Sequence, residues 1–288
     1  MPSTLRTETA EGVRSIILTR AREYNTITPA LRDELSAAIN EADNDRDVRV
    51  IMLAAEGPAF CAGYELASST RAQSDEPERA RVWDSVADLG MIGRYVDVYM
   101  KLWYSPKPTI AAVNGWCIGG GTDMVLCSDI IIAAESASFG YPPARVWGTP
   151  TTAMWVYRMG LERAKRYLLT GDEIPAPEAA RIGLILETVP DPQLREHALA
   201  LARRMARLPL SQLKMLKLLC NHTAENMGLG TSRLIGSLFD GIARHTQEGL
   251  DFVARAREAG FRQAVRERDD PFGDYGSGPR SRRPRNRR

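Results

Sequence analysis

The sequence contains little that would place it in a membrane, a disulfide framework or a metal site. No apolar run in its 288 residues approaches the roughly 20 that span a bilayer, and residues 1–4 lead into charged sequence without an apolar signal segment. We therefore expect a cytoplasmic protein without membrane association. Four cysteines without a Cys-x-x-Cys spacing and three scattered histidines argue against a disulfide framework and against a bound metal.

The net charge of +2 hides an uneven distribution of basic residues. Six of the 38 Lys and Arg residues lie in the last nine positions, Arg280–Arg288, so the rest of the chain is mildly acidic. The Gly, Pro, Ser and Arg composition of this end cannot bury apolar surface, which predicts a disordered tail over residues 273–288. A basic tail can contact nucleic acid, but no aromatic residue is interleaved for base stacking. We favour a solvated extension without a nucleic-acid partner.

The most informative stretch runs from Pro108 to Asp129. Thr109–Val113 is a short apolar run that predicts a buried strand, broken by Asn114-Gly115. Gly119-Gly120-Gly121 then opens a helix expected over Thr122–Cys127. Glycines allow a ligand to approach the backbone closely, and a helix N-terminus presents unpaired N–H groups. The loop is therefore suited to negative charge.

Nucleotide phosphate is not the charge that this loop predicts. The spacing from Gly115 to Gly120 fits the start of a phosphate-binding loop, but Gly121 stands where that loop requires lysine. No Gly-x-Gly-x-x-Gly occurs in the chain. Both common nucleotide motifs are therefore excluded.

The N-terminal part predicts a layered α/β fold. Val13–Thr19 and Val48–Ala55 have the composition of strands, as does the later run Asp129–Ala134. Between the first two, Thr28 can cap a helix that begins with Pro29. A strand, a helix and a returning strand indicate a crossover within a parallel sheet. One face of this helix is apolar: Leu31, Leu35, Ala38, Ile39 and Ala42.

Several motifs in order resemble the enoyl-CoA hydratase/isomerase (crotonase) family. They are the triple glycine with an acid two residues later, Phe60-Cys61-Ala62-Gly63-Tyr64-Glu65-Leu66, Phe139-Gly140-Tyr141-Pro142, Tyr167–Gly171, Glu178–Leu184 and Gln247–Phe252. The resemblance implies an α/β fold, a crotonase-like spiral of repeated ββα units with a C-terminal helical trimerisation region. It implies an acyl-CoA-binding core over residues 1–190 and a helical oligomerisation region over residues 191–272, forming a homotrimer or hexamer.

The same resemblance implies a lyase or isomerase acting on an acyl-CoA thioester. No cofactor is expected beyond the coenzyme A that is part of the substrate. The backbone N–H groups of Tyr64 and Gly120 would form the oxyanion hole, and Asp123 would be the catalytic carboxylate. The residues expected to bind substrate are Ala62, Gly63, Gly119, Gly121, Tyr141, Pro143 and Trp147.

One departure from the family pattern concerns the second catalytic glutamate. Pro143 occupies its position, and no Asp or Glu occurs from residue 136 to residue 161. Tyr141, Arg145 and Tyr64 are possible substitutes. We therefore expect slow addition of water to short enoyl-CoA substrates, and the alternative is an acyl-CoA-binding homologue with weak or no hydratase activity.

Two helical regions are also expected. Residues 68–106 are amphipathic in their second half and should form a helix over the pocket. After Pro190 the chain is helical in pattern and divided at Pro209. Its apolar faces are too broad for an isolated helical appendage, which is a second indication of self-association. They include Leu213, Leu216, Leu218, Leu219, Leu234, Leu238, Phe239 and Ile242.

Overall fold

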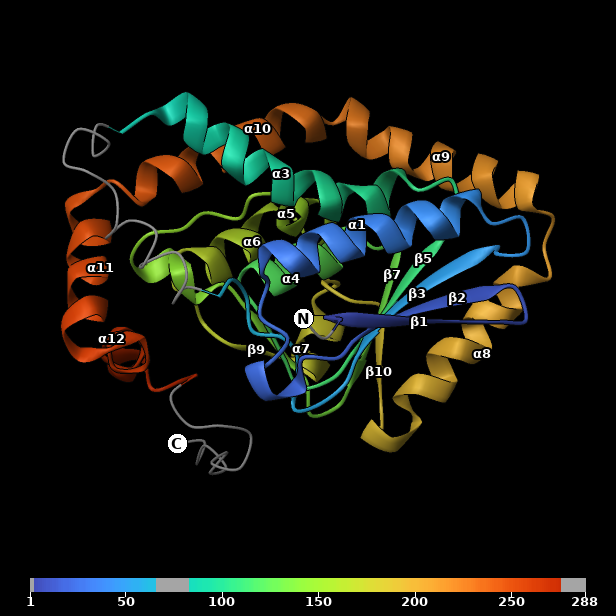
Figure 1. The fold of residues 1–288 in the computed structure, drawn as a ribbon, viewed down its shortest axis with the longest axis horizontal. Coiled ribbons are helices and arrows are strands. Elements are labelled where there is room, and N and C mark those ends of the chain that lie inside the picture. Colours follow the sequence, from blue (N-terminus) through green and yellow to red (C-terminus); the bar gives the residue numbers. More distant parts are fainter. Residues whose placement is uncertain (1–2, 66–82, 276–288) are drawn as a thin grey trace.

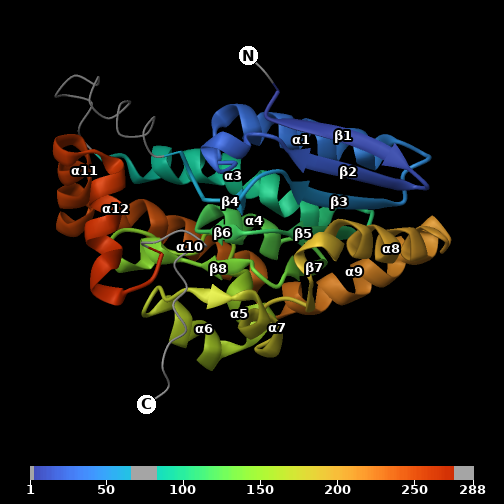
Figure 2. The same cartoon turned by 90° about the horizontal axis from the view of Figure 1, so that it is seen from below.

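Two sheets organise the computed structural model, which describes residues 3–65 and 83–275. The larger sheet has six strands in the order β1-β2-β3-β5-β7-β10, and most of them can be followed side by side in Figure 2. β1 is antiparallel to β2, whereas every other pair is parallel. The strands are β1 (Leu5–Ala10), β2 (Val13–Leu18), β3 (Val50–Ala55), β5 (Thr109–Val113), β7 (Ile130–Ala134) and β10 (Glu187–Val189).

The smaller sheet has four short strands in the order β4-β6-β8-β9. β4, β6 and β8 are parallel and β9 is antiparallel to β8. They are β4 (Ala59–Cys61), β6 (Trp116–Ile118), β8 (Ser138–Gly140) and β9 (Ile174–Pro175). Three times a strand of the large sheet is followed by a strand of the small sheet and then by a helix. This repetition confirms the predicted ββα units.

The helices of the repeats differ in length. α3 (Ser85–Tyr104) follows β4, α4 (Gly120–Leu126) follows β6, and α5 (Met154–Met159) follows β8 and a 3-10 turn. The predicted helix over residues 68–106 is confirmed from residue 85 to residue 104, and residues 68–82 lie outside the described residues. α6 (Leu161–Leu168) and α7 (Ala176–Arg181) come before β10.

The first crossover is as the sequence predicts. α1 (Pro29–Asn44) begins where the Thr28 side chain accepts a hydrogen bond from the Leu31 N–H, and the five apolar residues of its predicted face are all buried. β2 and β3 on either side of it are parallel. β1 was not predicted, because only its first residue is buried and the period-2 signal of a half-buried strand is therefore weak. Glu11 and Gly12, both with positive φ, form the turn into β2.

Within the described residues five α-helices follow β10, and they lie on different sides of the molecule (Figure 1). α8 (Leu194–Ala206) packs on β2, β3, β5 and β7 and so contributes to the main core. α9 (Leu210–Asn226) leads into α10 (Leu229–Ala243), which packs along α3. α11 (Gln247–Ala259) and α12 (Phe261–Asp269) pack on each other and hold a second hydrophobic cluster, which includes Trp147, Phe252, Val253, Ala256 and Ala264.

The last described residues correct the predicted start of the tail at residue 273. Asp274 accepts hydrogen bonds from both terminal nitrogens of Arg145, and the ring of Tyr275 lies 6.0 Å from that of Trp116. Residues 273–275 are therefore fixed against the core by an ion pair and aromatic packing that the composition of the tail did not indicate. Residues 276–288 lie outside the described part.

Apolar side chains remain exposed on α9 and α10. They include Met215, Leu216, Leu218, Leu219, Leu234, Ile235, Phe239 and Ile242. Exposure of this kind on neighbouring helices is typical of a surface that binds another chain. Within the described residues, no helix is both long and apolar enough to span a bilayer.

Candidate active site

The two glycine motifs meet at the start of α4. A Cβ atom added to Gly63 would lie 3.1 Å from the Ile118 carbonyl oxygen and 3.7 Å from the Gly120 nitrogen. Gly63 has a φ of 88° and Gly119 a φ of 57°, values that L side chains rarely adopt. The turn after β4 therefore packs directly on the segment that opens α4. The helix begins at Gly120, two residues before its predicted start.

Both predicted oxyanion donors come from these adjoining segments. Gly120 is the first residue of α4, so its N–H has no acceptor inside the helix. The backbone around Tyr64 is fixed by hydrogen bonds from the Ile27 N–H to the Gly63 oxygen, at 2.8 Å, and from the Glu65 N–H to the Ile27 oxygen, at 3.0 Å. Within residues 3–65 and 83–275, neither the Tyr64 N–H nor the Gly120 N–H has an acceptor. Both donors are therefore free of a partner within the described part of the protein.

The Tyr64 ring covers Gly120. A Cβ atom at Gly120 would come within 2.7 Å of Cε2 of Tyr64. The hydroxyl of Tyr64 accepts a hydrogen bond from that of Tyr99 on α3, at 3.1 Å, and its ring packs edge-on against Tyr95. Burial raises the pKa of the Tyr64 phenol, so it stays protonated at neutral pH. The ring thus narrows the space next to Gly120 without adding a charge.

Other predicted binding residues support this arrangement through the backbone. Ala62 donates its N–H to the Tyr24 oxygen, at 3.0 Å. A Cβ atom at Gly121 would stand 2.4 Å from the Cys61 oxygen, so only glycine allows α4 to pack this closely on β4. The close packing on β4 explains the glycine at position 121. The roles of Ala62 and Gly121 in substrate binding stay predictions.

Asp123 lies in the first turn of α4 and is only 1% exposed. Its Oδ2 accepts hydrogen bonds from the Thr151 N–H at 2.8 Å and from the Thr151 hydroxyl at 2.9 Å. Its Oδ1 accepts one from the Trp155 Nε1, at 3.1 Å. Burial raises the pKa of Asp123 to about 6, although the three hydrogen bonds favour the ionised form. Asp123 thus ties the start of α4 to the start of α5.

Pro143 and Tyr141 adjoin the same loop. A Cβ atom at Gly119 would be 3.6 Å from Cγ of Pro143, so position 143 lies beside the triple glycine as the resemblance implies. The Tyr141 hydroxyl donates to the Thr149 oxygen at 2.7 Å. The ring of Tyr141 packs edge-on against Trp155. Neither residue supplies a carboxylate.

Two residues considered from the sequence have their contacts elsewhere. Arg145 binds Asp269 at 3.0 Å and Asp274 at 2.8 Å, and its guanidinium stacks on the Phe272 ring at 3.9 Å. This excludes it as the substitute for the missing glutamate, because its donors are engaged with the C-terminal segment. Trp147 packs on Phe252, at 5.2 Å between ring centroids, and its part in substrate binding stays a prediction.

The sequence analysis missed Asp240, which α10 brings to this region. A Cβ atom at Gly148 would lie 3.6 Å from Oδ1 of Asp240 and 2.7 Å from Cβ of Pro143. The pKa of Asp240 is raised to about 7, first by burial and further by the charge of Asp123, while Arg244 lowers it. The available signal was an aspartate within the apolar run of α10 between Phe239 and Ile242.

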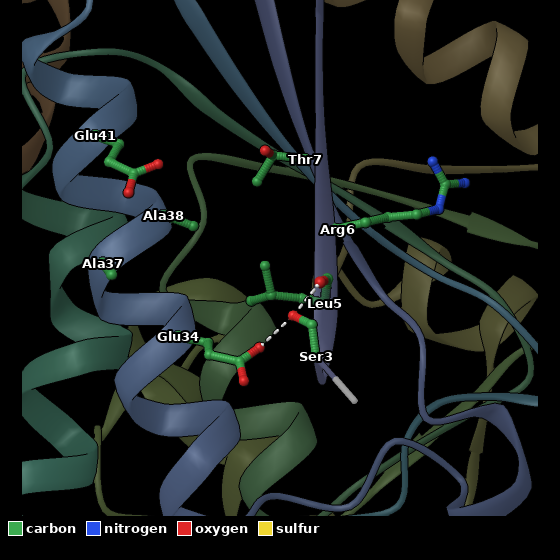
Figure 3. A pocket seen from close by; sticks show the side chains of 8 residues that line it. All are labelled: Ser3, Leu5, Arg6, Thr7, Glu34, Ala37, Ala38 and Glu41. Carbon is green, nitrogen blue, oxygen red and sulfur yellow. Dashed lines mark hydrogen bonds between the residues drawn. The ribbon is translucent and has the colours of Figure 1, made fainter. Parts of the chain in front are cut away.

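Other features of the described residues offer no second site. No group of three or more His, Cys, Asp and Glu side chains among them could hold a metal. A shallow groove of about 300 Å³ lies between β1 and α1 (Figure 3). Its Glu34 carboxylate accepts hydrogen bonds from the Ser3 hydroxyl and from the Thr4 N–H, both at 2.8 Å. These bonds fasten the first strand to α1, which is a structural role.

Comparison with known proteins gives consistent results. The sequence profile of a family described as Enoyl-CoA hydratase/isomerase matches residues 8–264. A probable enoyl-CoA hydratase of Rhodobacter capsulatus is 34% identical over 209 residues, covering 72% of this chain and 76% of the relative. A hydroxycinnamoyl-CoA hydratase-lyase of Pseudomonas fluorescens is 30% identical over 210 residues, covering 70% and 72%.

Solved structures extend the similarity to almost the whole chain. An enoyl-CoA hydratase from Mycobacterium smegmatis superimposes with a TM-score of 0.88 at 43% identity, covering 95% of each chain. An enoyl-CoA hydratase/isomerase from Xanthobacter autotrophicus Py2 superimposes with a TM-score of 0.83 at 29% identity, covering 94% of this chain and 98% of the other. The crotonase fold inferred from the motifs is thereby confirmed.

Proposed function

Because the chain belongs to the enoyl-CoA hydratase/isomerase family, we propose that it is an acyl-CoA-processing enzyme that stabilises a thioester enolate. The observation that carries the proposal is the contact between the turn at Gly63 and the start of α4. It brings the Tyr64 and Gly120 backbones together with both N–H groups free of acceptors among the described residues. The thioester oxygen would be bound between them.

Backbone donors of this kind act on charge that develops during the reaction. When a proton leaves the α-carbon, or when water adds to the β-carbon, negative charge collects on the thioester oxygen. Two fixed N–H groups then contribute roughly 2.7–4 kcal/mol each to transition-state stabilisation. The Tyr64 backbone is held by its bridge to Ile27 and the Gly120 backbone by α4, so the donors need no rearrangement when the charge appears.

Asp123 is the carboxylate that we assign to proton handling in this site. It lies three residues after Gly120, and its pKa of about 6 is close to neutral pH, where a group can both accept and release a proton. The reaction is then that of a lyase or an isomerase, with the coenzyme A thioester as substrate. We further propose that the exposed apolar faces of α9 and α10 form the contacts of a homotrimer or hexamer.

A second candidate function is acyl-CoA binding with weak or no turnover. It is favoured by Asp123 itself, because both of its oxygens already accept hydrogen bonds from Thr151 or Trp155. It is also favoured by the absence of an acid at Pro143. Here the fold would retain the thioester but lack a free proton carrier.

Two measurements on the wild-type protein separate these functions. Titration with crotonyl-CoA tests thioester binding, and nuclear magnetic resonance in D₂O follows water addition to crotonyl-CoA and exchange of the α-proton of butyryl-CoA. Binding with either reaction supports the enzyme, and binding without either supports the second candidate. If neither thioester binds, both proposals are wrong.

A further inference from the structure

The carboxylate that the sequence lacks beside the glycine loop has a counterpart on α10. We propose that Asp240 is a catalytic residue of this site, the second proton carrier in place of a side chain at position 143. This inference rests on the proposed function, since it assigns a role within the same site. It differs from what the motifs imply, because Asp240 lies 97 positions after Pro143 and in none of them.

Residues 143 and 240 both lie close to Gly148. Pro143 and Asp240 approach the same point from two elements: a methyl group on Gly148 would be 2.7 Å from Cβ of Pro143 and 3.6 Å from Oδ1 of Asp240. Pro143 in turn lies against Gly119, immediately before the proposed donor Gly120. Pro143, which replaces the family's second glutamate, and the carboxylate of Asp240 therefore both border Gly148.

The segment between residues 147 and 151 is held against α10 on this side. The Thr149 hydroxyl donates to the Gly236 oxygen at 2.9 Å, and the Ser237 hydroxyl donates to the Thr151 oxygen at 3.3 Å. A methyl group on Gly236 would stand only 2.5 Å from the Pro150 oxygen, so glycine permits this close packing. The same loop binds Asp123 through Thr151, and it thereby fixes the two carboxylates relative to each other.

The charged groups around Asp240 leave it only weakly paired. From its own helix, Nε of Arg244 lies 3.8 Å from Oδ2, whereas another nitrogen of Arg244 is 3.2 Å from Oδ1 of Asp88 on α3. Asp88 also binds His245, at 3.0 Å. The Thr149 N–H favours the ionised form of Asp240, while Asp123 and Asp88 disfavour it. The phenols of Tyr64 and Tyr141 interact electrostatically with both Asp123 and Asp240. Burial raises the pKa of each phenol, so both remain neutral at neutral pH.

Asp240 and Asp123 therefore differ in what they can do. Both oxygens of Asp123 are engaged by three donors, and the residue is 1% exposed. The side chain of Asp240 is 19% exposed, so water can reach it. Its pKa of about 7 leaves it ionised and protonated in similar amounts at neutral pH, which suits a group that exchanges protons with water.

In hydration, Asp123 and Asp240 would together carry one proton, both before and after the reaction. Ionised Asp123 takes a proton from water while the water oxygen bonds to the β-carbon, and the carbon–carbon π electrons move onto the thioester as an enolate. The enolate collapses as Asp240, which has the higher pKa and carries the shared proton, gives that proton to the α-carbon. Both hydrogens and the oxygen of water are then accounted for, and a proton passing from Asp123 to Asp240 restores the pair.

The test replaces the Asp240 carboxylate by an amide of similar size, so that the packing of α10 is kept. Asp240→Asn should lower kcat for crotonyl-CoA hydration and the rate of butyryl-CoA α-proton exchange by about 10² to 10⁴-fold, with KM little changed. Asp240→Glu should recover part of this loss, and the ionisation near pH 7 should vanish from the kcat profile of Asp240→Asn. The control is Asp97→Asn, which removes an ion pair between α3 and α10, with Arg233 at 3.9 Å, from a side chain that is 73% exposed. It should match wild type.

The outcomes distinguish this inference from the function on which it rests. A wild-type protein that binds neither thioester, or that catalyses neither reaction, would overturn the proposed enzyme and the role of Asp240 with it. An active wild type whose Asp240→Asn variant keeps the wild-type kcat and pH profile would overturn the role of Asp240 alone. Should Asp240→Asn fail to fold, Asp240→Ser takes its place with the same readouts.

Discussion

The ring of Tyr64 rests on Gly120, so that a Cβ atom at Gly120 would come within 2.7 Å of the ring's Cε2 and within 3.1 Å of Cδ1 of Ile27. The residue that supplies one proposed oxyanion donor thus closes the space beside the other. Only glycine at position 120 leaves room for this ring. The space beside the Gly120 N–H is accordingly limited by a side chain that the family motif does not specify.

Replacing Gly120 by proline removes one proposed donor. We expect Gly120→Pro to lower turnover by about 10² to 10³-fold, because one donor to the developing oxyanion is lost, while free coenzyme A still binds. Gly120→Ala keeps the N–H but adds the methyl group that meets Tyr64, so the loss of turnover in Gly120→Pro beyond that in Gly120→Ala is the part due to the missing donor. Kinetics and coenzyme A titration check both variants. Unchanged turnover in folded Gly120→Pro would remove the oxyanion hole from the mechanism.

Two substitutions test Asp123. One removes its carboxylate, and the other removes one of its hydrogen-bond donors. Asp123→Asn should lower turnover by about 10² to 10⁴-fold, because a proton carrier is lost. Trp155→Phe keeps the carboxylate but removes one hydrogen bond to its ionised form, so the pKa of Asp123 should rise above about 6. The acidic limb of the pH–rate profile should move to higher pH in Trp155→Phe. An acidic limb that stays in place would assign that ionisation to another group.

The Asp240 carboxyl should make stability depend on pH. Its pKa is raised from 3.8 to about 7 in the folded state, so the folded protein binds more protons than the unfolded chain between these values. The free energy of unfolding contributed by this group therefore falls as pH rises from about 4 to about 7, by up to about 1.4 kcal/mol per pH unit. Asparagine does not titrate. The stability of Asp240→Asn relative to wild type should thus increase across this window and then level off.

Urea unfolding of both proteins from pH 4.5 to pH 8 measures that difference. Carboxylates whose pKa is lowered, such as Glu178 and Glu267, contribute equally to the stability of both proteins. Their contributions therefore cancel in the difference. A stability difference that is flat with pH would show that Asp240 has an ordinary pKa.

Self-association through α9 and α10 is tested at an exposed leucine. Leu219 is 68% exposed on α9, and placing a charge there should dissociate a trimer that buries this face. Light scattering should give a trimer or a multiple of it for wild type and smaller species for Leu219→Glu. Leu169→Glu, at a leucine that is 82% exposed after α6, is the control and should leave the assembly intact. A stable wild-type monomer at micromolar concentration would contradict the proposal.

Deletion of residues 278–288 should leave folding and turnover unchanged. These positions hold no apolar side chain other than prolines, and the contacts of Asp274 and Tyr275 with the core are retained. Thermal unfolding and turnover of the truncated chain provide the measurement. A large loss in either would mean that the arginines bind the folded body or the phosphates of coenzyme A.

Local sequence determined the parts of this protein whose signals lie within a few residues. The cap at Thr28 and the apolar face of α1 were predictable, because a helix shows its buried side at a spacing of three and four residues. β5 and the glycines around the start of α4 were likewise predictable, since buried strands, the positive φ of Gly119 and the close packing of Gly120 and Gly121 restrict residue type strongly. The motifs also indicated the family, and the comparisons confirmed it.

Only the tertiary structure decided which distant side chains share the site. Asp240 and Pro143 both border Gly148 because α10 packs along α3 and its Gly236 approaches Pro150, and nothing in the sequence near either residue indicates this proximity. Likewise, the sequence allows Arg145 as a substitute, whereas in the structure it binds Asp269 and Asp274. The physical reason is the same in both cases. A charged side chain takes its role from the partners that folding brings to it, and those partners lie far away along the chain.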